Sequence, residues 1–342
     1  MRNRAEDSRG ALHDLFGVFA GYLLFVLVHV VADYGPAGDL AFAEVTQRLA
    51  AALPGATVLA TPVGPFDTLA AGFVVAQLAL TEGPAERVVF HNVAPRRDEA
   101  NPRRANEGER FTAAETPNGT LVVGPNSGHS LAFLHDQATL FYLDVPSAGS
   151  QFRSRDFLPA AVGRLVAGDR GDIGEAISSE LVPRVPVGVV AYTDGYGNLK
   201  TTLDEAPATN GERVLVRVGE ASATAIVSDG SFSVAEGEIA LAPGSSGWPL
   251  GDGGERRFLE LFCAGEARPR GSASPRPARR SSSAGHPVPS DDRGWLCWDF
   301  CVRRVTSERS PRAVVGYDSS RRSRRLRTSR RASSSHATTA SA

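Results

Sequence analysis

Residues Val26–Asp39 read VLVHVVADYGPAGD, and this stretch decides the fold of the chain. A run rich in β-branched residues ends at Asp33 and breaks into a Gly/Pro turn. From Leu40 onward, apolar residues recur at helical spacing. The pattern predicts a buried parallel strand that leads into a helix. Because ligands of open α/β sheets bind at the carboxyl ends of such strands, we expect Asp33 to lie at a ligand site.

Two interpretations of Asp33 remain open from this segment alone. A carboxylate at the end of a strand can accept hydrogen bonds from both hydroxyls of a ribose. In the alternative, Asp33 only caps the turn that follows it.

Strands and helices alternate along the chain after this first pair. We expect further strands at 56–60, 87–91 and 120–123 and a helix at 68–80. This alternation predicts an α/β domain with a mostly parallel sheet. The loops that follow the strands would then gather along one edge of the sheet.

From Val187 onward the sequence pattern changes to one typical of short strands and turns. Turn signals recur about every ten residues, which indicates a small all-β domain, either a sandwich or a barrel. The sequence therefore predicts four parts. They are an N-terminal extension at 1–25, an α/β domain at 26–182, an all-β domain at 183–262 and a disordered Arg/Ser-rich tail at 263–342.

The formal net charge of −1 combines two unlike parts. From Cys263 onward the chain has 17 Arg, no Lys and 6 acidic residues, so this part carries +11. The preceding part has 20 basic and 32 acidic residues, which gives −12. An acidic body argues against wholesale binding of nucleic acid by the folded part. The basic tail either contacts RNA or anionic membranes or is simply solvated without a function.

The apolar stretch 15–32 is nearly long enough for a signal peptide or a membrane span. It contains the strand that precedes Asp33, however, and His29 interrupts it, so we expect no membrane segment. All three cysteines lie in the basic tail, and the CxxxC pair has no histidine at a zinc-finger interval. This usage predicts a cytoplasmic protein without a disulfide framework or a metal site.

Five blocks together resemble the S-adenosylmethionine hydroxide adenosyltransferase family, which is related to the fluorinase and the chlorinase. The blocks are VADYG at Asp33, PNSG at Asn126, SQFRSRDFLPAA at Asp156, YTDGYGNLKT at Asp194 and GSSG at Ser245. Their order and approximate spacing agree with the family over 28–262. The resemblance implies a homotrimer that binds S-adenosylmethionine, its substrate, between neighbouring subunits and uses no cofactor. Water or halide would attack C5′ of the ribose and release methionine.

The resemblance also implies which residues bind the substrate. Asp33 matches the acid that holds the ribose hydroxyls. Asp194 and Asn198 match the Asp and Asn of a D-x-F-G-N turn, in which Tyr196 replaces Phe, and are expected near the methionine and adenine ends of the substrate. Ser245 and Ser246 match a serine stretch beside the methionine. The expected substrate-binding residues are Asp33, Tyr34, Asn126, Asp194, Tyr196, Asn198, Ser245 and Ser246.

The catalytic residues of the hydrolases carry over less well. The water-activating Asp falls at Asn92, and the Arg has Arg103 and Arg104 as candidates. The His of the FHGRD block is Arg153, which would favour an anionic nucleophile.

Two histidines in the matching loops are candidate bases. His91 and His129 would each have an ordinary pKa near 6.5 and could take a proton from water, or either could be an ordinary loop residue. The sequence thus leaves two main functions open. One is an S-adenosylmethionine hydrolase, and the other is a binding protein for S-adenosylmethionine or a nucleoside without turnover. A third, with less support, is an RNA-associated protein that works through its tail.

Overall fold

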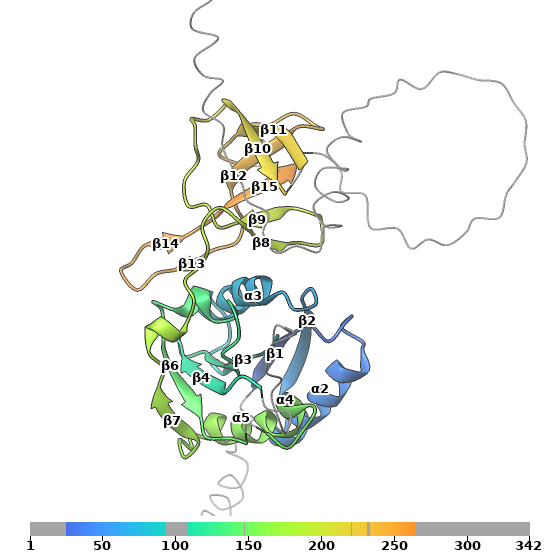
Figure 1. Cartoon of the computed structure of the whole chain (residues 1–342), viewed down its shortest axis with the longest axis vertical. Helices are drawn as coiled ribbons and strands as arrows, with labels where there is room; N and C mark the ends of the chain where they lie inside the picture. The colour runs from blue at the N-terminus through green and yellow to red at the C-terminus, as the bar shows by residue number, and fades with distance from the viewer. Residues whose placement is uncertain (1–24, 94–107, 147, 220, 231–232, 265–342) are drawn as a thin grey trace, which may run out of the picture. The chain divides into compact units, whose positions relative to one another are not determined.

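The computed structural model describes residues 25–93, 108–146, 148–219, 221–230 and 233–264 (Figure 1). The extension at 1–24 and the tail from 265 onward lie outside the described residues. The chain forms two compact units, which we describe separately. Of the described residues, the first contains those from 25 to 185 together with Trp248–Glu255, and the second contains those from 186 to 247 and from 256 to 264. The segment Trp248–Glu255, which the sequence assigns to the all-β domain, thus groups with the first unit.

The first unit is built on a seven-stranded sheet with the order β2-β1-β3-β5-β4-β6-β7. The strands are β1 (Leu27–Ala32), β2 (Thr57–Pro62), β3 (Arg87–Asn92), β4 (Phe111–Glu115), β5 (Leu121–Pro125), β6 (Thr139–Leu143) and β7 (Ile173–Ala176). Strands β2, β1, β3 and β5 pair in parallel, as the sequence predicts. Strands β4, β6 and β7 add an antiparallel half, which the sequence analysis missed.

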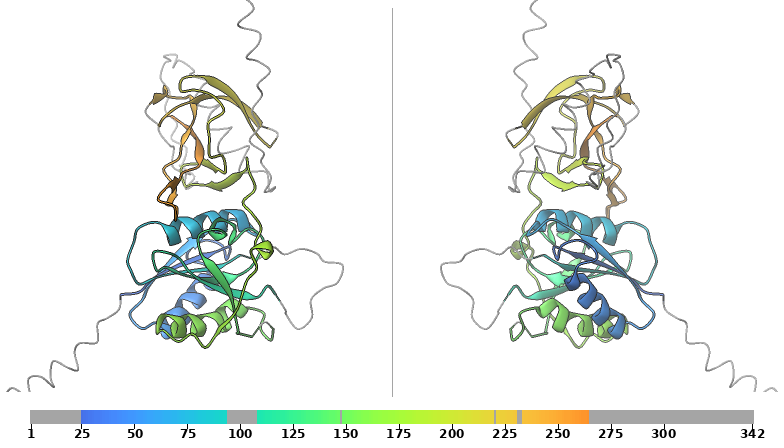
Figure 2. Two further views of the ribbon diagram at one scale, coloured as in Figure 1. Left: turned by 90° about the vertical axis from the view of Figure 1, so that its left-hand side faces the viewer. Right: turned by 90° about the vertical axis from the view of Figure 1, so that its right-hand side faces the viewer.

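Helices cover both faces of this sheet. They are α2 (Leu40–Ala52), α3 (Thr68–Leu80), α4 (Arg153–Asp156) and α5 (Leu158–Val166), with the short 3-10 turns η1 (Ala132–Leu134) and η2 (Ser179–Leu181). Helices α2 and α5 lie on one face and α3 lies on the other (Figures 1 and 2). The carboxylates of Asp39 and Asp67 cap α2 and α3, because they accept hydrogen bonds from the N–H groups of Ala41 and Ala70.

The two helical layers bury different kinds of surface. Helix α2 packs one apolar stripe, which includes Phe42 and Leu49, against the sheet. Helix α3 is apolar around most of its circumference and is buried on nearly all sides. Its outer side contacts aromatic rings, because Phe73 lies 5.7 Å from Phe133 and 5.9 Å from Trp248 between ring centroids. This packing explains why Trp248 groups with the first unit.

The second unit is a six-stranded sheet with the order β10-β11-β12-β15-β9-β8. Its strands are β8 (Val190–Thr193), β9 (Leu199–Thr201), β10 (Arg213–Val218), β11 (Ala221–Val227), β12 (Ile239–Pro243) and β15 (Leu259–Cys263). The short strands β13 (Trp248–Pro249), which groups with the first unit, and β14 (Glu255–Arg256) form a separate two-stranded sheet. Pairing in the larger sheet is antiparallel except between β11 and β12. Its core is aliphatic and includes Leu199, Val216 and Leu261.

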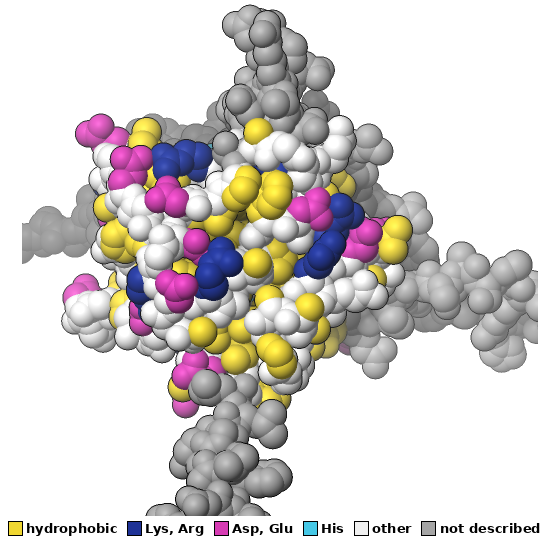
Figure 3. All heavy atoms as spheres, turned by 90° about the horizontal axis from the view of Figure 1, so that it is seen from below, with side chains coloured by type: hydrophobic (Ala, Val, Ile, Leu, Met, Phe, Trp, Pro, Cys, Tyr) yellow, Lys and Arg dark blue, Asp and Glu magenta, His cyan; other side chains and the backbone are white. Residues whose placement is uncertain are grey.

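Among the described residues, no helix combines the length and the apolar composition needed to cross a membrane. On the face that Figure 3 shows, basic and acidic side chains are interspersed with apolar ones.

Candidate functional site

The carboxyl ends of β1 and β2 meet at Asp33. Asp33 follows β1 directly, and its Oδ2 accepts a hydrogen bond of 2.9 Å from the backbone N–H of Phe66. Phe66 lies in the turn between β2 and α3 and has a φ of +59°, the one positive φ of a non-glycine residue in the described part of the chain. Such a conformation costs on the order of 1 kcal/mol, and the ring remains 47% exposed. The turn therefore fixes the carboxylate of Asp33 through the backbone of Phe66, whose side chain is exposed.

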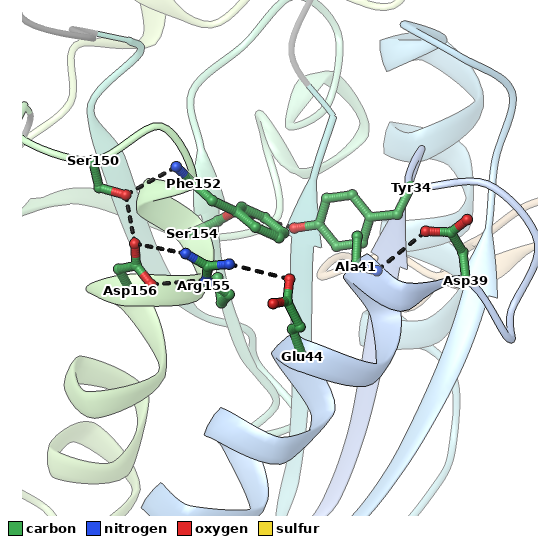
Figure 4. Close-up of polar contacts among 9 residues, drawn as sticks. All are labelled: Tyr34, Asp39, Ala41, Glu44, Ser150, Phe152, Ser154, Arg155 and Asp156. Carbon is green, nitrogen blue, oxygen red and sulfur yellow. Dashed lines mark hydrogen bonds and ion pairs between the residues drawn. The ribbon is translucent and has the colours of Figure 1, made fainter.

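Tyr34 links three segments of the first unit. Its hydroxyl lies 3.1 Å from Oγ of Ser154 (Figure 4). Its ring meets Phe42 and Phe152 edge-on at centroid distances of 5.1 and 5.3 Å. Burial raises the pKa of the Tyr34 phenol, and hydrogen bonds with Ser154 and Asn92 offset only part of this effect. The phenol is therefore neutral at physiological pH.

An ionic cluster fastens α4, which carries Ser154, to α2. Arg155 donates from Nε to Oδ1 of Asp156 at 2.8 Å and from Nη1 to Oε2 of Glu44 at 3.1 Å (Figure 4). Hydrogen bonds from Arg155 and from Ser150 lower the pKa of Asp156 to about 2. The cluster thereby ties α4, and with it the backbone of Ser154, to α2.

Arg153, also on α4, reaches toward the start of β4. Its Nη2 donates to the carbonyl of Glu109 at 3.0 Å, and its guanidinium carbon lies 4.9 Å from the centroid of the Phe111 ring. Arg153 is thus held by backbone and aromatic contacts.

The end of β3 presents two polar residues on opposite faces of the sheet. Asn92, which pairs in register with Ala32, is half-buried and contributes a hydrogen bond to the Tyr34 phenol. His91 is fully buried, and neither ring nitrogen has a hydrogen-bond partner within the described ranges. Burial lowers the pKa of His91 to about 3. Its ring fits because residue 124 is glycine, since a Cβ there would lie 2.4 Å from Nε2 of His91.

The loop after β5 holds Asn126 and His129. Asn126 donates from its backbone to the carbonyl of Arg110 at 3.0 Å and from its side chain to Leu181 at 3.3 Å. The backbone N–H of His129 donates to the hydroxyl of Thr68 at 3.1 Å. Burial lowers the pKa of the His129 ring, which remains half-buried.

In the second unit, Asp194 organises the turn between β8 and β9. Its Oδ1 accepts from the N–H groups of Tyr196 and Asn198 at 2.9 and 3.0 Å, and its Oδ2 accepts from the side-chain amide of Asn198 at 3.0 Å. Lys200 places its ammonium 3.7 Å from the same oxygen. The ring of Tyr196 is 74% exposed.

Ser245 and Ser246 follow β12 in the same unit. Ser245 is exposed, Ser246 is half-buried, and the N–H of Ser245 donates to Oε2 of Glu260 at 3.4 Å.

The described structure thus gathers Asp33, Tyr34 and Asn92 at adjacent strand ends in the first unit, with Phe66 as a member that sequence reasoning missed. The signal that could have found Phe66 is the GPFD turn directly before a helix. Arg103 and Arg104 lie outside the described residues. Within those residues, no group of three or more His, Cys, Asp and Glu side chains could hold a metal ion.

No protein-family model matches the chain, and a comparison with curated proteins finds no match. Among solved structures, the chain is similar to an uncharacterized conserved protein from Thermotoga maritima. The TM-score is 0.51 at 20% identity, and the match covers 69% of this chain and 92% of that chain. A conserved hypothetical protein from Thermus thermophilus matches with a TM-score of 0.48 at 27% identity, over 70% of this chain and 92% of that chain. The first likeness shows a shared fold, and neither description names a ligand or an activity.

Proposed function

We propose that this protein binds S-adenosylmethionine and hydrolyses it to adenosine and methionine. The observation that carries the proposal is the carboxylate of Asp33, which the N–H of Phe66 fixes at 2.9 Å where two parallel strands end. A fixed carboxylate suits the two hydroxyls of a ribose. Phe66, whose backbone holds this carboxylate, has an exposed side chain that offers an apolar surface on which a nucleobase can stack.

The second unit would contribute residues near the methionine and adenine ends of the substrate. The Asp194–Asn198 turn presents the exposed ring of Tyr196, and Ser245 presents an exposed hydroxyl. The proposal includes the homotrimer that the sequence resemblance implies.

The proposed reaction needs no general acid to protonate the leaving group. The oxygen of water attacks C5′, the C5′–S bond breaks, and its electron pair stays on sulfur. The sulfonium thereby becomes the neutral thioether of methionine, and the proton of water passes to solvent or to a base. Since the leaving group is neutral, orientation of the water in line with the C–S bond supplies much of the catalysis. Asn92 and the neutral Tyr34 phenol are the groups proposed to orient it.

A specific observation favours a second candidate, a binding protein without turnover. The polar groups that meet at the Tyr34 hydroxyl are a serine hydroxyl and an amide, and neither is a base at neutral pH. The guanidinium of Arg153 stays protonated and cannot serve as one.

Incubation with S-adenosylmethionine in H2¹⁸O separates the two candidates. Hydrolysis would give methionine and adenosine with ¹⁸O at the 5′ hydroxyl, whereas the binding protein would give calorimetric binding without either product. The Asp33→Ala variant is the control for contaminating enzymes, because product formed equally by this variant would not come from the proposed site.

A histidine base gives a distinct pH dependence. The rate rises with pH while the base loses its proton, and it should fall about 100-fold when the responsible histidine becomes alanine. Burial lowers the pKa of both candidates, to about 3 for His91. The rise should therefore lie below the ordinary histidine range, and a rate governed by His91 should be flat at neutral pH. An inflection at or above pH ~6.5 would remove both histidines from the mechanism.

A further inference from the structure

Lys200 and Glu260 form a buried ion pair in the second unit. They lie directly opposite each other on the antiparallel strands β9 and β15. The ammonium of Lys200 is 2.9 Å from Oε2 of Glu260, and the two residues are 7% and 5% exposed. A buried pair of this kind is costly to desolvate, and apolar residues of similar volume often stabilise a fold as well. Stability alone is therefore a weak reason for its presence.

The contacts around the pair reach two separate segments of the chain. Besides Glu260, Lys200 approaches Oδ2 of Asp194 at 3.7 Å, and Asp194 holds the turn up to Asn198. Glu260 uses the same Oε2 to accept the N–H of Ser245 at 3.4 Å. The Asp194–Asn198 turn and Ser245 are thus connected across the sheet by the ammonium of Lys200 and the carboxylates of Asp194 and Glu260.

The segment before Ser245 packs tightly on this pair. A Cβ added at Gly244 would lie 3.0 Å from Oε2 of Glu260 and 3.0 Å from the carbonyl of Phe258. The N–H of Gly244 donates to that carbonyl at 2.8 Å. Glycine therefore lets the backbone approach the carboxylate closely enough to be held by it.

We propose that Lys200 and Glu260 are positioning residues that hold the Asp194–Asn198 turn and the Gly244–Ser246 segment in one fixed arrangement. Neither residue needs to touch the ligand. Their effect on binding rests on the proposed function, in which the turn lies near the methionine and adenine ends and the serine segment lies beside the methionine. A prearranged pair of segments binds more tightly because less ordering occurs on binding.

Lys200→Met tests the positioning directly, without any ligand. We expect amide hydrogen exchange at Asn198 and Ser245 to become at least 10-fold faster, although neither N–H contacts the ammonium. The amides of Val216 and Ala225, in the far part of the same sheet, serve as internal references. Unchanged exchange at Asn198 and Ser245 would overturn the proposal. Lys200→Arg, which keeps the charge, should keep most of the protection.

A double variant distinguishes a positioning role of the ion pair from a contribution to stability alone. It also serves if the single variant does not fold. Lys200→Met with Glu260→Met removes both charges and keeps a buried apolar pair. We expect normal thermal unfolding, fast exchange at Asn198 and Ser245, and S-adenosylmethionine binding weakened at least 10-fold in calorimetry. Parental exchange in this variant, or parental affinity, would overturn the proposal. If the parent protein itself does not bind S-adenosylmethionine, the proposed function fails, while the exchange measurement still decides the positioning role.

Discussion

Asp33 and Asp194 occupy matching places in the sequence, each directly after a strand, and the structure surrounds them differently. Asp33 accepts the N–H of Phe66, which is 33 residues away and belongs to another strand end. Asp194 accepts two N–H groups and an amide from its own turn and lies beside Lys200. An aspartate at a strand end is thus compatible with a binding role in one unit and a largely structural role in the other.

This difference predicts where substitutions act. The cost of changing Asp194 should appear mainly in the stability of the second unit. The cost of changing Asp33 should appear mainly in ligand affinity.

The largest effect is expected for Asp194→Ala. Removing this carboxylate takes away three hydrogen bonds and leaves Lys200 with one carboxylate. We expect the free energy of unfolding to fall by about 3 kcal/mol. Each of the three hydrogen bonds contributes about 1 kcal/mol, because partial exposure of the turn reduces the ~1.5 kcal/mol or more that is usual for a bond to a charged group. Urea unfolding of the variant and the parent measures this difference in the free energy of unfolding. Asn198→Ala, which removes one of the three bonds, should cost about 1 kcal/mol.

The two units also treat buried polar groups differently. The first buries the His91 ring without a hydrogen-bond partner among the described residues, whereas the second pairs the buried Lys200 with Glu260. The folded pKa of His91 is lowered to about 3. The unfolded chain therefore binds an extra proton below pH ~6.5, so this contribution to stability is complete above that pH and is lost as the pH falls toward 3. Between pH ~7 and ~4.5 the loss should be about 2.5 kcal/mol. Chemical unfolding over this range, with His91→Leu as the non-titrating control, measures it.

The histidine prediction has a clear contrary outcome. If the parent and His91→Leu lose stability in parallel between neutral and acidic pH, the ring is not buried as a neutral group.

Asp33→Ala tests the other half of the comparison. Losing charge-assisted hydrogen bonds to a ribose should weaken S-adenosylmethionine binding by about 2 kcal/mol, a change of about 30-fold in Kd. The free energy of unfolding should change by less than about 1 kcal/mol, because Asp33 is only half-buried. Calorimetry and urea unfolding on the same samples give both numbers. Parental affinity in this variant would show that Asp33 only organises the turn at Phe66.

Much of the fold follows from local sequence. Helix α3 is predicted at its observed bounds, because Asp67 caps it and a long apolar run follows. Strand β4 was missed because its two central alanines have a weak strand preference. A usable signal existed in Asn118-Gly119, the turn that joins β4 to its partner β5, where Gly119 has a φ of +81°.

The sites were predictable only in part, for a physical reason. Residue types at strand ends single out Asp33 and Asp194, but their partners depend on which strands become neighbours. The contact from Asp33 to Phe66 requires β1 beside β2, and the pair of Lys200 with Glu260 requires β9 beside β15. Such pairings join segments that are distant in the chain, so no local pattern contains them.

Tyr34→Phe gives the smallest expected effect. The ring keeps its contacts with Phe42 and Phe152, and only the hydroxyl that meets Ser154 is lost. We expect the free energy of unfolding to fall by about 1 kcal/mol, the usual value for one neutral hydrogen bond. Ser154→Ala is the matched control, and the double variant should cost little more than either single one, because both remove the same bond.

The values of kcat and KM for Tyr34→Phe show whether the Tyr34 hydroxyl orients the water, binds the substrate or only packs. If Tyr34 and Asn92 orient the attacking water, Tyr34→Phe should lower kcat by about 10-fold or more and leave KM nearly unchanged, because orientation acts in the transition state. If Tyr34 only packs against its neighbours, kcat should follow the small loss of stability and stay near the parental value. A rise in KM with kcat intact would instead assign the hydroxyl to substrate binding. The site around Tyr34 would then resemble that around Asp33, with affinity rather than catalysis set by a single polar contact.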